Sequence, residues 1–252
     1  MRSTPRCSPA NIVRSWVWKG EAMSGPPGVI AAAWAIARKD LTVELRTRAA
    51  FLSAAVFSVL AAAIFLYTWD PTAVASIDLA PGVLWVIFTF AGLLGLHRSF
   101  SAELADRAID GLLIAPIRRE AVFLGKAFAN LIFVLGVQVV AIPTVVLFYN
   151  LSLGWGAAAA IAGITVLASV GLVAVGTLFS AMAVNTRLAE LLLPVLALPF
   201  FVPVVTAAAQ ATVLVINGRP LSGAVDWMRV LVAFDLVFVP ACTVAYPFTI
   251  ES

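Results

Sequence analysis

Three carboxylates near the middle of the chain have a spacing that suits recognition of another protein. Glu103, Asp106 and Asp110 follow one another at i, i+3 and i+7, so a helix over residues 99–114 would place all three on one face. Apolar side chains would line another face of the same helix. An acidic stripe beside an apolar one fits a groove with a basic rim on a soluble partner. A solvated charged face fits the pattern equally well, so both interpretations are open at this point.

Groups that would bind nucleotide, metal or haem are single or incomplete. Gly125-Lys126 lacks the upstream glycine and the following Ser or Thr of a P-loop, which would cradle a phosphate. His97 is the one histidine, so no zinc site can form from histidines around it. An interfacial polar residue is a better interpretation of His97 than a haem ligand. The sequence therefore predicts no catalytic residue, bound cofactor, metal site or ATP site in this chain.

Asp235 is the one ionisable side chain inside a long apolar run near the C-terminus. A charge at the centre of a bilayer costs about 2.5–3.5 kcal/mol, so such residues usually have a functional role. Asp235 also lies six positions past Arg229, roughly 9 Å along a helix, which favours a hydrated position near the outer interface. The amides of Asn130, Gln138 and Gln210 are predicted to tie helices together inside the bundle.

The composition shows which kind of structure must position these groups. Of 252 residues, 62% are hydrophobic and 12% are charged, whereas soluble domains carry about 25% charged residues. A soluble globular fold is therefore excluded. The net charge of +3 does not indicate nucleic-acid binding, because in a membrane protein the placement of basic residues matters more than their sum.

Six apolar stretches are long enough to cross a bilayer, which takes about 20 residues each. They must be helices, since a single segment in lipid has no other way to pair its backbone N–H and C=O groups. The sequence thus predicts an all-α polytopic membrane protein, with one permease-like domain over residues 29–252. The expected spans are residues 49–69, 79–96, 127–149, 157–184, 191–216 and 230–246.

Basic residues are sorted between the two sides of this predicted bundle. Eight precede the first span, five lie between spans 2 and 3, and one lies between spans 4 and 5, which leaves only Arg219 and Arg229 on the other side. The positive-inside rule therefore places both termini in the cytoplasm and the chain in the inner (plasma) membrane. Residues 1–28 are interpreted either as a disordered tail or as a segment ahead of a true start at Met23.

An additional helix is expected just before span 1. Apolar residues recur there at helical spacing and predict one stripe, while charged residues take other faces. This pattern favours an interfacial helix on the inner leaflet over a simple extension of span 1 into water. The stripe comprises Ile30, Trp34, Ala37, Leu41 and Leu45, and the charged residues include Arg38, Lys39, Glu44 and Arg46.

Span 5 contains Pro194, Pro199 and Pro203 at near-helical intervals. Each proline removes a backbone donor, and interrupted helices in membranes are tolerated where they line a cavity or repack. Span 5 is therefore expected to be a moving element.

Four short segments together resemble a known family. They are Arg38-Lys39-Asp40-Leu41, Ala80-Pro81-Gly82-Val83-Leu84-Trp85-Val86, Leu112-Leu113-Ile114-Ala115-Pro116, and Leu193-Pro194 through Phe201-Val202-Pro203. With six spans and a long loop between spans 2 and 3, the chain resembles type-2 ABC exporter permeases, and more narrowly the CcmB family of haem exporter permeases, over about residues 30–250. It departs from the family where Arg107 follows Asp106 in place of Gly, at Asp110 in place of Glu, and at Ala115 in place of Ser.

The resemblance implies a permease for haem export or delivery in c-type cytochrome biogenesis, without enzymatic activity of its own. ATP hydrolysis would belong to a separate ABC ATPase subunit, and haem would be a transported or handled substrate. The loop between spans 2 and 3 would be a coupling helix, which tilts the choice for its acidic stripe toward a partner surface.

A second permease or a haem-handling membrane protein is a further expected partner, and nucleic acid is not. Export of another amphiphile, such as a lipid-linked glycan, lipid or drug, is the alternative. The implied coupling residues are Glu103, Asp106, Asp110, Arg118 and Arg119, and the implied gating or structural residues are Pro81, Gly82, Trp85, Pro194, Pro199 and Pro203.

Overall fold

A computed structural model describes residues 28–70, 72, 74–105, 118–184, 189–219 and 221–250, with the side chains at 97–105, 184, 189–194, 221 and 250 outside the description. Within these ranges the chain forms seven α-helices and no strand. The helices are α2 (Val29–Thr47), α3 (Ala49–Thr68), α4 (Ser76–Ala105), α6 (Arg119–Phe148), α7 (Trp155–Val184), α8 (Ala189–Ile216) and α9 (Leu221–Ile250).

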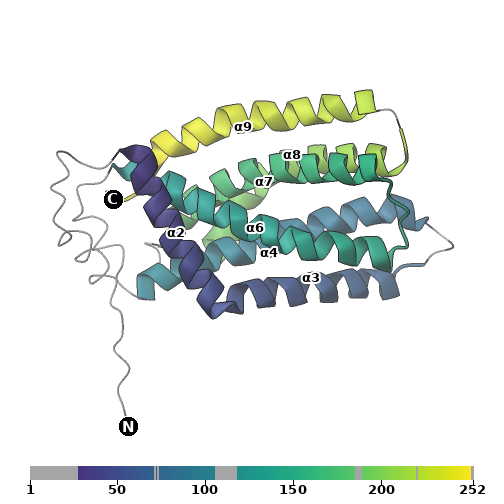
Figure 1. Ribbon diagram of the computed structural model, residues 1–252, viewed down its shortest axis with the longest axis horizontal. Coiled ribbons are helices and arrows are strands. Elements are labelled where there is room, and N and C mark those ends of the chain that lie inside the picture. Colours follow the sequence, from purple (N-terminus) through teal and green to yellow (C-terminus); the bar gives the residue numbers. More distant parts are fainter. Residues whose placement is uncertain are drawn as a thin grey trace, which may run out of the picture.

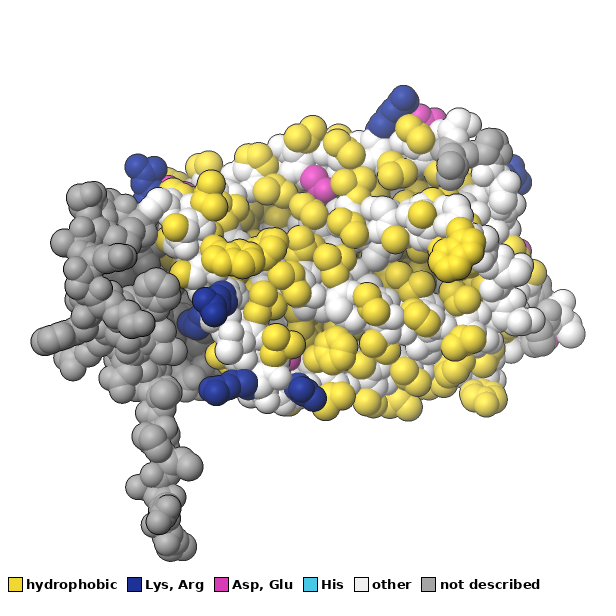
Figure 2. Space-filling model, in the orientation of Figure 1, with side chains coloured by type: hydrophobic (Ala, Val, Ile, Leu, Met, Phe, Trp, Pro, Cys, Tyr) yellow, Lys and Arg dark blue, Asp and Glu magenta, His cyan; other side chains and the backbone are white. Residues whose placement is uncertain are grey.

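Six of these helices, from α3 to α9, are long and apolar enough to cross a membrane. They lie side by side in one bundle, while α2 lies across one end of it (Figure 1). The predicted all-α, multi-pass membrane fold is therefore confirmed. Hydrophobic side chains cover much of the face shown in Figure 2, with basic side chains toward its two ends and an acidic side chain between them.

Two helices extend beyond the stretches predicted from the sequence, because charged residues continue a helix without ending it. The last span was expected to begin at residue 230, but α9 begins at Leu221. Its exposed Asp226 and Arg229 form an ion pair within the helix at 2.9 Å, so neither needs to lie in a loop. Likewise α4 continues past His97 to Ala105, where a separate short helix from residue 99 was expected, since no Gly or Pro interrupts this stretch.

α4 and α7 form the centre of the bundle. About two-thirds of the most apolar stretch of α4 and 56% of that of α7 are buried within the chain, against 22% for α3 and 11% for α9. Trp85 of α4 is 1% exposed and donates its indole N–H to the hydroxyl of Thr212 in α8, at 3.0 Å. Such a bond fixes the rotation of two neighbouring helices, because a buried indole N–H must find an acceptor.

Buried amides also link α6 to α7, as predicted for two of three residues. Asn130 donates to the Thr177 hydroxyl at 3.2 Å, and Gln138 donates to the Ser169 hydroxyl at 2.8 Å. Gln210, by contrast, is exposed on α8, so its predicted role as an interior tie was wrong. It lies only six residues before the end of α8, roughly 9 Å by the helical rise, where an amide can reach the polar interface.

Candidate functional site

The working surface suggested by the sequence lies at the end of the bundle crossed by α2, here called the α2 end. The start of α6 and the C-terminal turns of α9 lie at the same end (Figure 1). The links between α3 and α4, α6 and α7, and α8 and α9 form the opposite end, here called the far end. Seven of the nine described Lys and Arg side chains belong to the α2 end, and Arg219 and Arg229 belong to the far end.

α2 packs tightly along the first turns of α6. Gly125 makes this possible, because a Cβ there would stand 2.6 Å from the carbonyl oxygen of Ala33 and 2.9 Å from the Cβ of Ile36. Ile36 and Ala37 are buried in this seam. The close approach was not evident from the sequence, since nothing in it tells a tight glycine from an open one until the partner helix is known.

The predicted apolar stripe of α2 is divided between two faces. Ala37 is buried in the bundle, whereas Ile30, Trp34 and Leu45 are largely exposed. The helix meets α6 through Ala33, Ile36 and Ala37, and the ring of Trp34 lies 5.9 Å from that of Phe128 at the edge of this contact. Among its charged residues, Arg38 and Arg46 are exposed, and Lys39 forms an ion pair with the adjacent Asp40 at 3.1 Å.

Glu44 has a role that the charge pattern did not predict. Its carboxylate accepts a hydrogen bond from the backbone N–H of Phe51, at 3.2 Å, in the first turn of α3. Between them Arg48 takes a left-handed conformation with φ of 51°, and its N–H bonds the carbonyl oxygen of Glu44 at 2.8 Å. One residue therefore turns the chain from α2 into α3, and Glu44 satisfies an N–H that the helix start would leave unpaired.

Two contacts connect α6 to the C-terminal turns of α9. Arg119 donates to the carbonyl oxygen of Pro247 at 3.4 Å, and the rings of Phe123 and Tyr246 lie 5.3 Å apart. Arg118 is exposed and directly precedes α6. Of the predicted acidic stripe, Glu103 lies in α4 with its side chain outside the described residues, and Asp106 and Asp110 lie wholly outside them.

The predicted gating residues fall on different surfaces. Pro81 and Trp85 of α4 are buried, whereas Gly82 is exposed and would accept a Cβ without contact. In α8, Pro199 and Pro203 are exposed, and the helix is continuous through both of them. The side chain of Pro194 lies outside the description. The two described prolines of α8 thus face away from the core of this chain.

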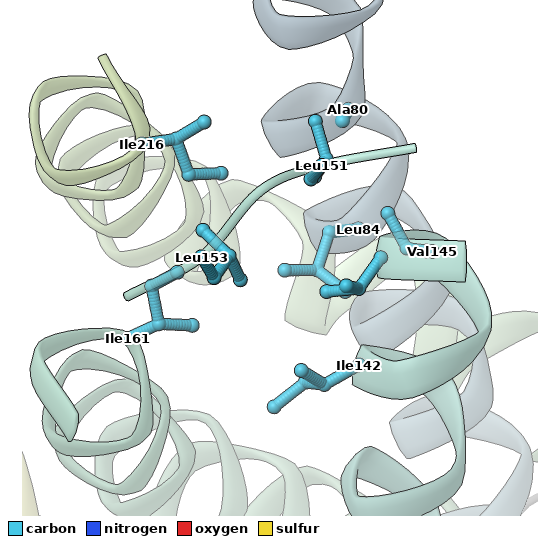
Figure 3. A pocket seen from close by; sticks show the side chains of 9 residues that line it. Ala80, Leu84, Ile142, Val145, Leu151, Leu153, Ile161 and Ile216 are labelled. Carbon is cyan, nitrogen blue, oxygen red and sulfur yellow. The ribbon is translucent and has the colours of Figure 1, made fainter. Parts of the chain in front are cut away.

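The far end encloses a small apolar cavity of about 10 Å³ (Figure 3). This volume is near the minimum for a single water molecule, and its lining offers aliphatic side chains and no polar partner. Drug-sized ligands occupy about 300–1,000 Å³, so this cavity cannot hold haem. The lining residues are Ala80, Leu84, Ile142, Val145, Val146, Leu151, Leu153, Ile161 and Ile216. Among the residues described, no group of three or more His, Cys, Asp or Glu side chains is placed to hold a metal ion.

A crossing helix joined to a six-span bundle is the arrangement expected from the family that the sequence resembles. A family model described as CcmB protein matches residues 31–252. The chain belongs to the CcmB family. It is 28% identical over 204 residues to heme exporter protein B of Bradyrhizobium diazoefficiens, which covers 81% of this chain and 90% of that protein. It is 29% identical over 179 residues to heme exporter protein B of Rhodobacter capsulatus, covering 70% and 80%.

A third relative, heme exporter protein B of Pseudomonas aeruginosa, is 26% identical over 216 residues and covers 80% of this chain and 90% of that protein. The family match spans the crossing helix as well as the bundle, because it begins at residue 31, within α2. This CcmB family member is thus a multi-pass membrane protein in which α2 belongs to the family domain.

Proposed function

We propose that this chain is the transmembrane permease subunit of an ABC exporter that serves haem export or delivery for c-type cytochrome biogenesis. The observation that carries the proposal is the family match over residues 31–252, together with three relatives that are each named heme exporter protein B. The chain would act as a transporter subunit and not as an enzyme, with ATP hydrolysed by a separate ABC ATPase. Export of another amphiphile by the same architecture is the alternative.

The α2 end would face the cytoplasm and receive the ATPase. Most described basic side chains lie there, which is the distribution expected of a cytoplasmic surface in the inner membrane. Exposed Ile30, Trp34 and Leu45 on α2, with Arg38 and Arg46, suit a helix lying in the inner leaflet among anionic headgroups. Both termini would then be cytoplasmic.

Haem would be handled between this chain and its partners. The enclosed cavity of about 10 Å³ is far too small for it. A path bounded by this chain and a second permease or haem-handling membrane protein would need no large cavity in either subunit. The proposal therefore includes membership of a haem exporter complex.

Deletion of the chain in its own host tests the function. Covalent haem in c-type cytochromes should fall to background, as seen by haem staining of membrane proteins, and the full-length chain should restore it. b-type cytochromes, which bind haem non-covalently, serve as the control and should persist. Normal covalent haem in the deletion strain would contradict the haem proposal and favour another amphiphile.

Charge reversal tests the docking of the ATPase on the loop between α4 and α6. Asp106→Lys combined with Asp110→Lys should abolish co-purification of the ATPase subunit, because a basic-rimmed groove would repel the new charges. The matched control is Asp78→Lys, which alters an exposed carboxylate at the far end of α4. Equal co-purification from both variants, at equal levels in the membrane, would rule out the acidic stripe as the docking surface.

A further inference from the structure

α9 is the least enclosed of the six spanning helices, and it carries a carboxylate on its length. Only 11% of its most apolar stretch is buried within the chain. Its inner side packs through Phe234 and Phe238, whose rings stack at 4.1 Å, and Phe238 meets Phe200 of α8 at 5.8 Å. Its outer side exposes large apolar side chains such as Leu236 and Val244. Asp235 lies between these two sides and is partly buried.

The depth of Asp235 in the membrane follows from its distance along α9 to the ion pair of Asp226 and Arg229. Asp226 and Arg229 form an exposed ion pair near the start of α9, and two charged side chains are placed most favourably where α9 leaves the hydrocarbon at the far end. Asp235 is six residues further along the helix, about 9 Å deeper, in a hydrocarbon layer about 30 Å thick. An aspartate has one methylene group and cannot reach back over that distance as a lysine or arginine can. We therefore place its carboxylate in the apolar part of the membrane, deeper than the hydrated interfacial position expected from the sequence.

The structure makes room for this carboxylate but gives it no partner among the described residues. A Cβ on Gly171 of α7 would stand 2.6 Å from the Asp235 Oδ1, so the oxygen occupies the space that the glycine leaves. Within the described residues, Asp235 forms no hydrogen bond and no ion pair. Asp235 thus lies at the seam between α7 and α9, beside an apolar surface.

The helix α7 beside Asp235 and the rest of α9 beyond Arg229 offer no cation. The sequence has no Lys, Arg or His between Lys126 and Arg187, and none after Arg229. A second copy that packed on the same face would oppose the carboxylate with another carboxylate or with apolar side chains. Charged groups inside membranes pair with one another or line a polar path, because an isolated charge in hydrocarbon is costly. Charge complementarity therefore points to a different chain.

We propose that the face of α9 around Asp235 binds a transmembrane helix of another membrane protein, and that this helix carries a Lys or Arg at the depth of Asp235. An open hollow of about 350 Å³ lies on the adjoining outer side of α9 and would receive the apolar side chains of that helix. Its residues recur at helical spacing on one side of α9 and are Val225, Met228, Arg229, Val232, Ala233 and Leu236. The close packing and one charged hydrogen bond are the interactions that hold membrane helices together.

This inference rests on the six-span arrangement and on the charges of α9, and not on haem or the acidic loop. It deepens the proposed membership of a membrane complex by naming the surface and the chemistry of one partner. A failure of the haem proposal would leave it standing, because its test below measures contact between helices and not cytochrome assembly.

Site-specific photo-crosslinking in the native host tests the proposal. A benzophenone amino acid replaces Leu236, which is 71% exposed, in the full-length chain, and the cross-linked peptide is identified by mass spectrometry. We expect a transmembrane peptide of another protein that contains a Lys or Arg within about one helical turn of the cross-link. Asp235→Asn should lower the yield by about threefold to twentyfold, the range that follows from measured bonds between membrane helices. Asp235→Glu and the matched control Asp226→Asn should retain the yield.

Four results would overturn the proposal: no adduct, an adduct with a second copy, a partner span without a Lys or Arg, or an unchanged yield in Asp235→Asn. Membrane levels of each variant are measured on the same samples. If Asp235→Asn does not accumulate, replacement of the partner's cation by Met gives the same test from the other side, since that variant should lower the yield in the same way.

Discussion

The two halves of the bundle differ in how closely their helices approach. Toward the α2 end, neighbouring residues occupy the space beside three helical glycines. A Cβ on Gly95, Gly125 or Gly176 would collide with Phe133, Ala33 or Leu96 respectively. Toward the far end, a Cβ would meet nothing within 4 Å at the glycines Gly82, Gly154, Gly156, Gly163 and Gly218. Tight glycine contacts therefore lie toward the α2 end, whereas the far end has open glycines and is held by other contacts, such as the bond from Trp85 to Thr212.

This difference indicates which helices would move together if a partner displaced the α2 end. Small residues that let backbones meet closely form the stiffest contacts between membrane helices. We expect α2, α6 and the end of α9 to move as one body, because Gly125, Arg119 and Phe123 connect them. The far end has no comparable tight glycine among the described residues, so it is the half that can separate.

The largest expected effect comes from filling the tightest seam. Gly125→Ala places a methyl group 2.6 Å from a backbone carbonyl oxygen, which cannot turn aside, so we expect a loss of about 1–3 kcal/mol in stability. Thermal unfolding in detergent should shift to lower temperature, and trypsin should cleave α2 more readily. The matched control is Gly163→Ala in α7, which meets open space and should leave stability equal or slightly higher. Equal midpoints for the two variants would refute the comparison between the halves.

An intermediate effect is expected where a polar bond joins α6 to α7. Ser169→Ala removes the acceptor of the Gln138 amide, so the free energy of unfolding should fall by about 0.6 kcal/mol and by no more than about 1.7. Gln138→Leu added to Ser169→Ala should recover part of the loss, since no buried amide then lacks its partner. Gln210→Leu, on the exposed side of α8, should stay within about 0.5 kcal/mol. A larger loss from Gln210→Leu than from Ser169→Ala would be contrary to this account.

The smallest effect is expected in the link between α3 and α4, which is held by local bonds. Hydrogen bonds from the Thr72 hydroxyl and backbone N–H hold the pKa of the Asp70 carboxyl below its ordinary value. Because the pKa is lowered in the folded chain, the bond contributes above the unfolded pKa and is lost as pH falls through the folded pKa.

Thr72→Ala should therefore raise the pKa of Asp70 part of the way toward its ordinary value, with one backbone bond remaining. Carboxyl ¹³C NMR titration of the purified protein measures this directly. Thr68→Ala is the control, because that hydroxyl bonds the carbonyl oxygen of Ile64 and not Asp70. A pKa of Asp70 that moves in the control and not in Thr72→Ala would contradict the assignment.

The fold could be predicted from the sequence because the scarcity of charged residues shows that the chain lies in lipid. Long runs without charge must be helical in lipid, and these runs correctly predicted six spans. Helix α9 begins before the predicted start of the last span, because the pairing of Arg229 with Asp226 lets the helix continue through both charged residues. A charged residue alone therefore does not mark the end of a helix, because an ion pair within the helix lets the helix continue.

The candidate site could be predicted only in part, because its contacts join residues far apart in the chain. Gly125 and Ala33 are ninety-two positions apart, and no local pattern shows that they touch. Glu44 looked like one more charge of an interfacial helix, yet it caps the first turn of α3. The positions Asp106 and Asp110 were chosen by spacing and family resemblance, and their role remains a prediction.

The left-handed turn at Arg48 sets the immersion of the first span. α3 begins at the next residue and runs for 20 residues, about 30 Å, which equals the hydrocarbon thickness with nothing to spare. If α2 rests on the membrane surface, a linker of one residue gives α3 no slack to slide along the membrane normal. Any lift of α2 would then draw the polar boundary of α3 into the lipid and create a hydrophobic mismatch, which the bilayer would resist by deforming. The bilayer deformation would thus exert a restoring force that returns α2 to the membrane surface.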